Sequence, residues 1–245
     1  MTTILVTGGT GTLGRFVIER LRAGGGHEVR ELSRRSEQYP VDLRTGAGLA
    51  DAVAGAEVIV HCASTPKAGA DEVAARHLID AARSAGVRHL VYISIVGIDR
   101  VPLPYYRTKL AVERLIEESG LGHTVLRTTQ FHDLALTFAR GLTKLPVALV
   151  PTGVRLQPIA VDEVAGRLVE LALGEPVGHV PEMGGPEVLS LDAVVRAYLR
   201  ASGKRRPVLG VRLPGRLSGA LRAGGLLTPS NAVGKGTFEE FLGRG

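Results

Sequence analysis

A glycine-rich loop close to the N-terminus limits what this chain can fold into more than any other feature. The loop, Thr7-Gly8-Gly9-Thr10-Gly11-Thr12-Leu13-Gly14, follows a short apolar run at Thr3–Thr7. Apolar residues at helical spacing follow it as far as Ala23. A strand, a glycine loop and a helix in this order are typical of the first βα unit of a parallel sheet.

Three glycines of the loop recur at every third position, Gly8, Gly11 and Gly14. Gly8 permits a tight turn, Gly11 lets the backbone approach a pyrophosphate, and Gly14 lets the helix pack closely on the sheet. The helix N-terminus presents N–H groups to the phosphates. The loop therefore predicts a dinucleotide site, with further contacts from Thr10, Thr12 and Leu13.

Strand and helix patterns alternate along the first half of the chain. Strands are expected at 3–7, 28–32, 39–41, 57–61, 89–94 and 123–127, and helices at 16–23, 47–53, 71–85 and 103–119. This alternation predicts an α/β fold, a doubly wound parallel sheet with helices on both faces.

After Arg127 the alternation becomes looser. Helices are expected at 133–142, 162–173 and 191–201, with an extended segment at 155–160. Residues 1–245 contain no linker-like tract, so we expect a single domain. From about residue 128 we expect a small C-terminal substrate lobe at the strand ends.

Composition excludes several classes of protein. Cys62 is the one cysteine, so neither an intramolecular disulfide nor a zinc site built on paired thiolates can form, and no metal site is expected. The N-terminus has no signal-peptide pattern and no run reaches the length of a membrane span, so we expect a cytoplasmic protein without a membrane partner.

The net charge of +6 is unevenly distributed along the chain. The segment from Arg200 onward contains nine basic and two acidic residues, a net charge of +7. The preceding residues therefore carry a net charge of −1. These basic residues are scattered and are not interleaved with the aromatic pair Phe238 and Phe241. The pattern favours a solvated surface over a nucleic-acid partner.

The end of the second predicted strand indicates which nicotinamide cofactor is preferred. NAD sites carry an acid about 20 residues after the glycines. Here the strand runs into Ser33, Arg34 and Arg35, whereas Glu31 lies too early. A guanidinium suits a 2′-phosphate, so the sequence favours NADP(H) over NAD(H).

Together these segments resemble the short-chain dehydrogenase/reductase superfamily, in particular its atypical NmrA-like, NAD(P)H-binding branch. Besides the glycine loop, the resemblance covers Asp42-Leu43, His61–Ser64, Val91–Ser94, Tyr105–Lys109, Leu126–Phe131 and Gln157–Ala165. It spans roughly two thirds of the chain and implies a Rossmann-type fold. It also implies that Asp42 and Leu43 flank the adenine, that Ala63 and Ser64 line the ribose side, and that Thr128 lies near the nicotinamide amide.

The resemblance points to a Tyr-x-x-x-Lys pair, Tyr105 and Lys109. Their i, i+4 spacing places both on one face of a helix. In the family, the lysine holds the nicotinamide ribose and lowers the tyrosine pKa. The tyrosine then exchanges a proton with the substrate oxygen while hydride moves.

The third member of the family's catalytic set is a serine just beyond the fifth strand. Ser94 matches the first serine of that stretch, but the usual catalytic position falls on Val96. This departure weakens the expectation of a full dehydrogenase. Ser94 remains a candidate that caps the strand and touches the nicotinamide.

Substrate contacts are expected after the sixth predicted strand, from Gln130, Phe131 and His132, with the helix at 134–142 covering the cleft. A structural role for His132 is the alternative.

Three functions remain open. The first is an NADPH-dependent reductase or isomerase for a small carbonyl or conjugated substrate. The second is an NADP(H)-sensing regulator that acts through a partner protein, and the third is a nucleotide-sugar epimerase. A homodimer or a regulatory partner also stays open.

Overall fold

The computed structural model describes residues 1–65 and 69–244. The chain divides into two compact units. Residues 1–94, 104–127 and 161–181 form the first, the sheet unit, and residues 95–103, 128–160 and 182–245 form the second unit. The stretch predicted as a C-terminal lobe thus contributes residues 161–181 to the sheet unit.

A seven-stranded parallel sheet forms the centre of the sheet unit, in the order β3-β2-β1-β4-β5-β6-β9. The strands are β1 (Thr2–Thr7), β2 (His27–Ser33), β3 (Tyr39–Pro40), β4 (Val58–His61), β5 (His89–Ile95), β6 (His123–Thr128) and β9 (Gly178–His179). The central strands β1, β4 and β5 are buried almost throughout because their residues are apolar on both faces. The predicted doubly wound sheet is confirmed.

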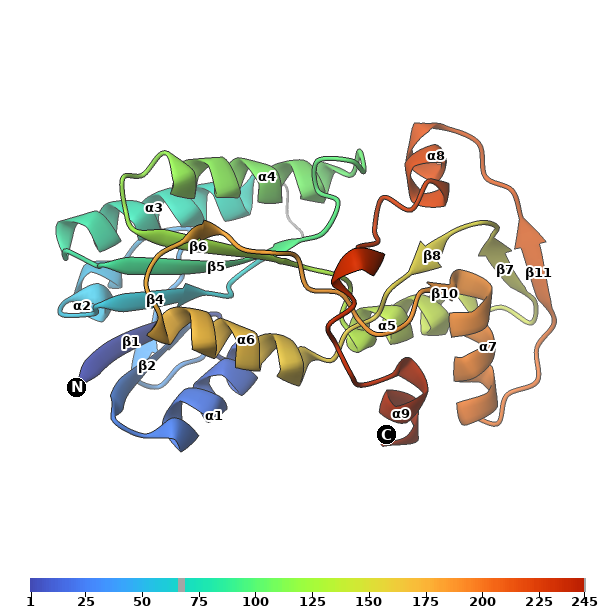
Figure 1. Ribbon diagram of the computed structural model, residues 1–245, viewed down its shortest axis with the longest axis horizontal. Coiled ribbons are helices and arrows are strands. Elements are labelled where there is room, and N and C mark those ends of the chain that lie inside the picture. The colour runs from blue at the N-terminus through green and yellow to red at the C-terminus, as the bar shows by residue number, and fades with distance from the viewer. Residues whose placement is uncertain (66–68, 245) are drawn as a thin grey trace. The chain divides into compact units, whose positions relative to one another are not determined.

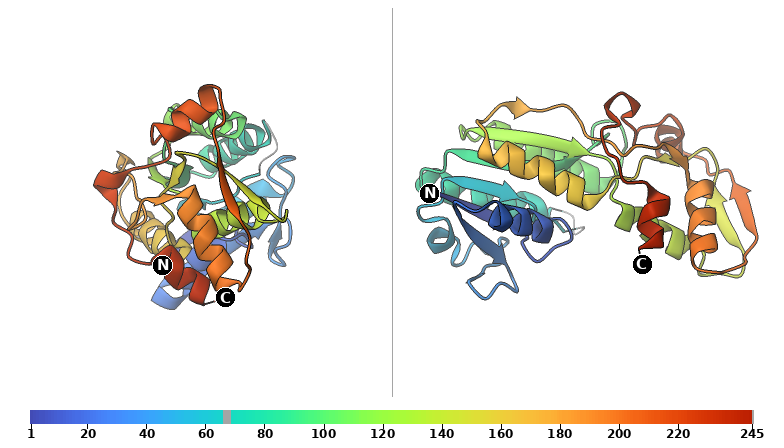
Figure 2. Two further views of the ribbon diagram at one scale, coloured as in Figure 1. Left: turned by 90° about the vertical axis from the view of Figure 1, so that its right-hand side faces the viewer. Right: turned by 60° about the horizontal axis from the view of Figure 1, so that its bottom comes forward.

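Helices cover both faces of this sheet (Figure 1). They are α1 (Gly14–Gly24), α2 (Leu49–Val53), α3 (Ala70–Ser84), α4 (Pro104–Glu117) and α6 (Val161–Leu173). Helices α1 and α6 pack side by side on one face, and α3 and α4 on the other. The right-hand view of Figure 2 shows α6, in gold, lying along the strands. Apolar side chains of the α3–α4 face, among them Leu78 and Ile116, are fully buried against the sheet.

The order of the strands creates a crevice for a ligand. The chain leaves β1 toward β2 on one side, and β4 pairs with β1 on the other. In doubly wound sheets, ligands bind beyond the carboxyl ends of the strands where the order reverses. A ligand site is therefore expected at the loops after β1 and β4.

The second unit contains shorter elements. Its helices are α5 (His132–Leu142), α7 (Leu191–Ala201), α8 (Arg216–Arg222), the 3-10 helix η1 (Pro229–Asn231) and α9 (Phe238–Gly243). Its strands, β7 (Ala148–Pro151), β8 (Arg155–Leu156), β10 (Leu189–Ser190) and β11 (Val208–Val211), form two two-stranded sheets, β8 with β10 and β7 with β11.

Two differences from the predicted elements stand out in the second unit. The extended segment at 155–160 is a strand only at its first two residues. Strands β7 and β11 were not predicted. Leu149 and Leu209 are apolar although their positions are about half exposed, so the sequence shows no alternation of apolar and polar residues there. Within the described ranges, no helix is both long and apolar enough to cross a bilayer.

Candidate nucleotide and catalytic site

The glycine loop brings two backbones into contact. Gly8 has a φ of +69°, and a Cβ built on it would lie 2.8 Å from the Ala63 backbone in the loop after β4. A Cβ on Gly14 would overlap the Gly8 carbonyl. The Gly11 N–H donates to that carbonyl at 2.8 Å, which closes the turn before α1. Side chains at these positions would therefore open the loop.

A cavity of about 310 Å³ lies at this point of the sheet unit. Nine of the predicted cofactor residues line it: Gly8, Thr10, Gly11, Ser33, Arg34, Asp42, Leu43, Ala63 and Ser64. They come from the loops after β1, β2, β3 and β4. The predicted residues Thr12, Leu13, Gly14, Lys109 and Thr128 lie outside this lining.

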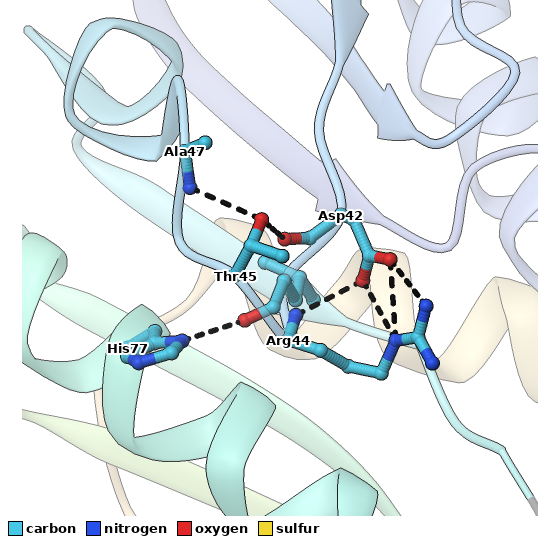
Figure 3. A network of polar contacts seen from close by, with 6 residues as sticks. Asp42, Arg44, Thr45, Ala47 and His77 are labelled. Carbon is cyan, nitrogen blue, oxygen red and sulfur yellow. Dashed lines mark hydrogen bonds and ion pairs between the residues drawn. The ribbon is translucent and has the colours of Figure 1, made fainter.

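Asp42 and Arg44 form an ion pair on the cavity wall (Figure 3). The Arg44 guanidinium donates from Nη2 to Asp42 Oδ2 at 2.6 Å and from Nε to Oδ1 at 3.0 Å. These bonds lower the pKa of Asp42 to about 2. Arg34 also lines the cavity, and its positive charge contributes to the same shift. The sequence analysis missed Arg44, although its position two residues after Asp42 was a usable signal.

Tyr105 and Lys109 lie on α4, as their spacing predicted. The Tyr105 hydroxyl is 2.7 Å from Ser64 Oγ, at the edge of the cavity. Lys109 is only 3% exposed; its Nζ donates to the Ile93 carbonyl at 2.9 Å and lies 4.2 Å from the centre of the Tyr92 ring. Burial lowers the pKa of Lys109 to about 8, against the opposing effect of Asp71.

Ser94 lies at the end of β5 and is only 1% exposed. Its hydroxyl makes no hydrogen bond with any residue in 1–65 or 69–244. The hydroxyl that contacts Tyr105 comes instead from Ser64, in the loop after β4.

Gln130 lies within the second unit and is buried there. Its Nε2 donates to the Leu226 carbonyl at 3.1 Å, and its Oε1 accepts from the Gln157 N–H at 3.2 Å. The Gln157 side chain in turn bonds to the backbones of Gly185 and Thr228. These contacts give Gln130 a role in linking distant segments, and its contact with a substrate stays a prediction.

The other candidates after β6 are also anchored in the second unit. The Thr128 carbonyl accepts from Val96 N–H at 2.9 Å. Phe131 pairs with Ile159 as an isolated bridge just before α5. The His132 ring lies 6.0 Å from the centre of the Phe238 ring and is 3% exposed. Substrate or cofactor contact by these residues stays a prediction.

Comparison with known proteins shows the family of the chain. Residues 8–172 match the NAD(P)H-binding family. The (4-alkanoyl-5-oxo-2,5-dihydrofuran-3-yl)methyl phosphate reductase of Streptomyces griseus is 30% identical, over 82% of this chain and 74% of its own length. The NAD(P)H azoreductase of Xenophilus azovorans is 31% identical, over 84% of this chain and 75% of its own.

A solved structure shares the fold along almost the whole length. The NADPH-dependent quinone oxidoreductase of Escherichia coli, in complex with NADPH, superimposes with a TM-score of 0.82 at 20% identity, covering 98% of this chain and 99% of that one. The family match extends from the glycine loop to α6 and so includes the residues that line the cavity. The chain belongs to the NAD(P)H-binding family, and its cofactor is NAD(P)H.

Proposed function

We propose that this protein is an NADPH-dependent reductase of a small carbonyl or conjugated substrate, with Tyr105 as the general acid. One observation carries the proposal: the Tyr105 hydroxyl bonds at 2.7 Å to Ser64, and Ser64 lines the same cavity as the glycine loop. The proton donor thus lies beside the nucleotide site. The names of the relatives, a butenolide-type phosphate reductase and an azoreductase, support a reductive role.

The residues at the cavity fit a dinucleotide. The loop at Gly8 and Gly11 leaves no side chain between its backbone and the cavity, so phosphates can approach closely. Helix α1 begins immediately after the loop, with its N-terminus there. We assign Thr10, Thr12, Leu13 and Gly14 to the pyrophosphate side and Asp42 and Leu43 to the adenine side.

The bound cofactor supplies the hydride. The residues of the chain supply the proton and the orientation. Burial raises the pKa of Tyr105, so its phenol holds its proton at neutral pH and can donate it to a substrate oxygen. Lys109 holds its charge below about pH 8, and we assign it to the nicotinamide ribose.

We assign the preference for NADPH to Arg34, which is exposed and lines the cavity after β2. A guanidinium–phosphate bond contributes roughly 1.5–3 kcal/mol. Arg34→Ala is therefore expected to lower the ratio of NADPH to NADH affinity by roughly tenfold or more, measured by calorimetric titration of both cofactors. Arg83→Ala, at the exposed end of α3, is the control. An unchanged ratio in Arg34→Ala would exclude this assignment.

The function itself is tested by NADPH oxidation with a panel of quinones, azo dyes, aldehydes and enones. Turnover is expected with at least one class. Tyr105→Phe is expected to lower kcat by roughly 10²–10⁴-fold, the usual contribution of a positioned acid, with NADPH affinity nearly intact. Turnover that Tyr105→Phe leaves unchanged would refute the assignment of the acid.

A second candidate is an NADP(H)-sensing regulator without turnover. The burial of Ser94 favours it, because the family's catalytic serine has no accessible equivalent at this position. For a sensor, Tyr105→Phe changes nothing measurable, whereas Lys109→Ala still weakens NADPH binding.

A further inference from the structure

Three polar groups form a chain that ends at the proposed acid. The Tyr105 hydroxyl lies 2.7 Å from Ser64 Oγ, and Ser64 Oγ lies 2.5 Å from Asp71 Oδ2. Ser64 follows β4, Asp71 belongs to the first turn of α3, and Tyr105 to the first turn of α4. The contact thus joins three separate elements of the sheet unit.

The protons of this chain have one consistent arrangement. A carboxylate accepts hydrogen bonds and donates none, so the Ser64 proton points to Asp71. Ser64 has no second proton, and its oxygen must accept from the Tyr105 hydroxyl. The direction is therefore Tyr105 to Ser64 to Asp71.

Asp71 is held rigidly enough to orient its neighbours. Its second oxygen, Oδ1, accepts from the Thr65 N–H at 2.8 Å, and the residue is only 5% exposed. Both carboxylate oxygens of Asp71 thus accept hydrogen bonds, from Ser64 and from Thr65. A buried carboxylate that accepts two hydrogen bonds fixes the rotamer of Ser64, and Ser64 fixes the orientation of the Tyr105 phenol.

The same groups act on the phenol electrostatically. Burial raises the pKa of Tyr105, the Ser64 hydroxyl lowers it, and the negative charge of Asp71 raises it. Tyr105 in turn contributes to the raised pKa of Tyr92 of β5 and of Tyr106 of α4, for which burial is the larger cause. Removal of Asp71 and removal of Ser64 should therefore change the ionisation of Tyr105 in opposite directions.

We propose that Asp71 is a positioning residue that orients the Tyr105 phenol through the Ser64 hydroxyl, and that Ser64 takes the part the family gives to a serine after β5. This inference rests on the proposed function. When Tyr105 protonates the substrate oxygen, its O–H bond breaks and the product O–H bond forms. The Ser64 hydroxyl then turns its one proton from Asp71 to the remaining phenolate, and the phenolate regains a proton from water before the next turnover, when Ser64 returns to Asp71.

The test combines kinetics with a direct titration of the phenol, on the full chain with NADPH and the acceptor that gives most turnover. The variants are Ser64→Ala, Asp71→Asn and the double variant, with Ser64→Thr as the conservative rescue. Ser84→Ala on α3 is the matched control, since the Ser84 hydroxyl donates to the Asp80 carbonyl of the same helix. Tyrosinate absorbance of each protein, minus that of the same protein carrying Tyr105→Phe, reports the ionisation of Tyr105 alone.

We expect each single variant to lower kcat by roughly tenfold or more with a smaller change in KM, because orientation of the acid matters in the transition state. The double variant should be no worse than Ser64→Ala, since Asp71 acts through Ser64. Ser64→Thr should restore most of the turnover. Tyr105 should ionise at lower pH in Asp71→Asn and at higher pH in Ser64→Ala.

Two results would overturn the inference: losses in the double variant that multiply, or a Tyr105 ionisation that Asp71→Asn leaves unchanged. If Tyr105→Phe abolishes turnover but Asp71→Asn does not affect it, the proposed function stands and this inference fails. If the protein turns over no acceptor, the titration still decides whether Asp71 and Ser64 control the phenol.

Discussion

Lys109 carries a positive charge at a place that water hardly reaches. Its amine has the Ile93 carbonyl and the face of the Tyr92 ring as neighbours, and burial lowers its pKa from 10.5 to about 8. At about 1.4 kcal/mol per pKa unit, the buried charge costs on the order of 3 kcal/mol at neutral pH. The proposed contact with the nicotinamide ribose would account for a lysine at this buried position.

Lys109→Met is therefore expected to stabilise the fold while it weakens NADPH binding. The folded-state pKa lies below the unfolded one, so the cost is fully present below about pH 8 and disappears as pH rises to 10.5. Urea unfolding should show Met more stable at pH 7 by roughly 1–3 kcal/mol, with the gap shrinking near pH 10. An equal gap at both pH values, or a less stable variant, would contradict this explanation.

At the scale of elements, the loop after β1 depends on glycine at two close contacts. Gly8 allows its contact with the loop after β4, and Gly14 allows its contact with the start of helix α1. Gly14→Ala would push a methyl group against the Gly8 carbonyl, at the start of α1. We expect NADPH affinity to fall by roughly tenfold or more, in fluorescence titration. Gly24→Ala, at the other end of α1, has nothing within 4 Å of its new Cβ and is the control. Similar losses in both variants would show that helix α1, and not the loop, is being perturbed.

Most helices and strands of the chain could be predicted from the sequence. Strands β1 to β6 and helices α1 to α7 were predicted within a few residues, because buried parallel strands and amphipathic helices carry strong periodic patterns. Helices α8 and α9 were not predicted, because helices of six or seven residues are too short to show a clear helical period of apolar residues. The sequence could not predict the partner of Tyr105. Ser64 follows β4 and Ser94 lies near the end of β5, and only the structure shows that Ser64 is the serine that contacts the phenol.

At the scale of the whole molecule, the proposed cofactor and catalytic residues lie mostly in the sheet unit. The glycine loop, the cavity, Tyr105, Lys109 and Ser94 all belong to the sheet unit, and Thr128 is the proposed cofactor residue in the second unit. That second unit is held by a buried network around Gln157 and carries the proposed substrate residues.

We propose that this protein transfers hydride from NADPH to a small acceptor. The most direct measurement uses NADPH deuterated at the transferable position of its nicotinamide ring, with the product analysed by mass spectrometry. The wild-type protein is expected to pass the deuterium into the product, and Tyr105→Phe is expected to form the same labelled product far more slowly. NADPH that binds the protein but gives no labelled product with any acceptor in the panel would contradict the claim.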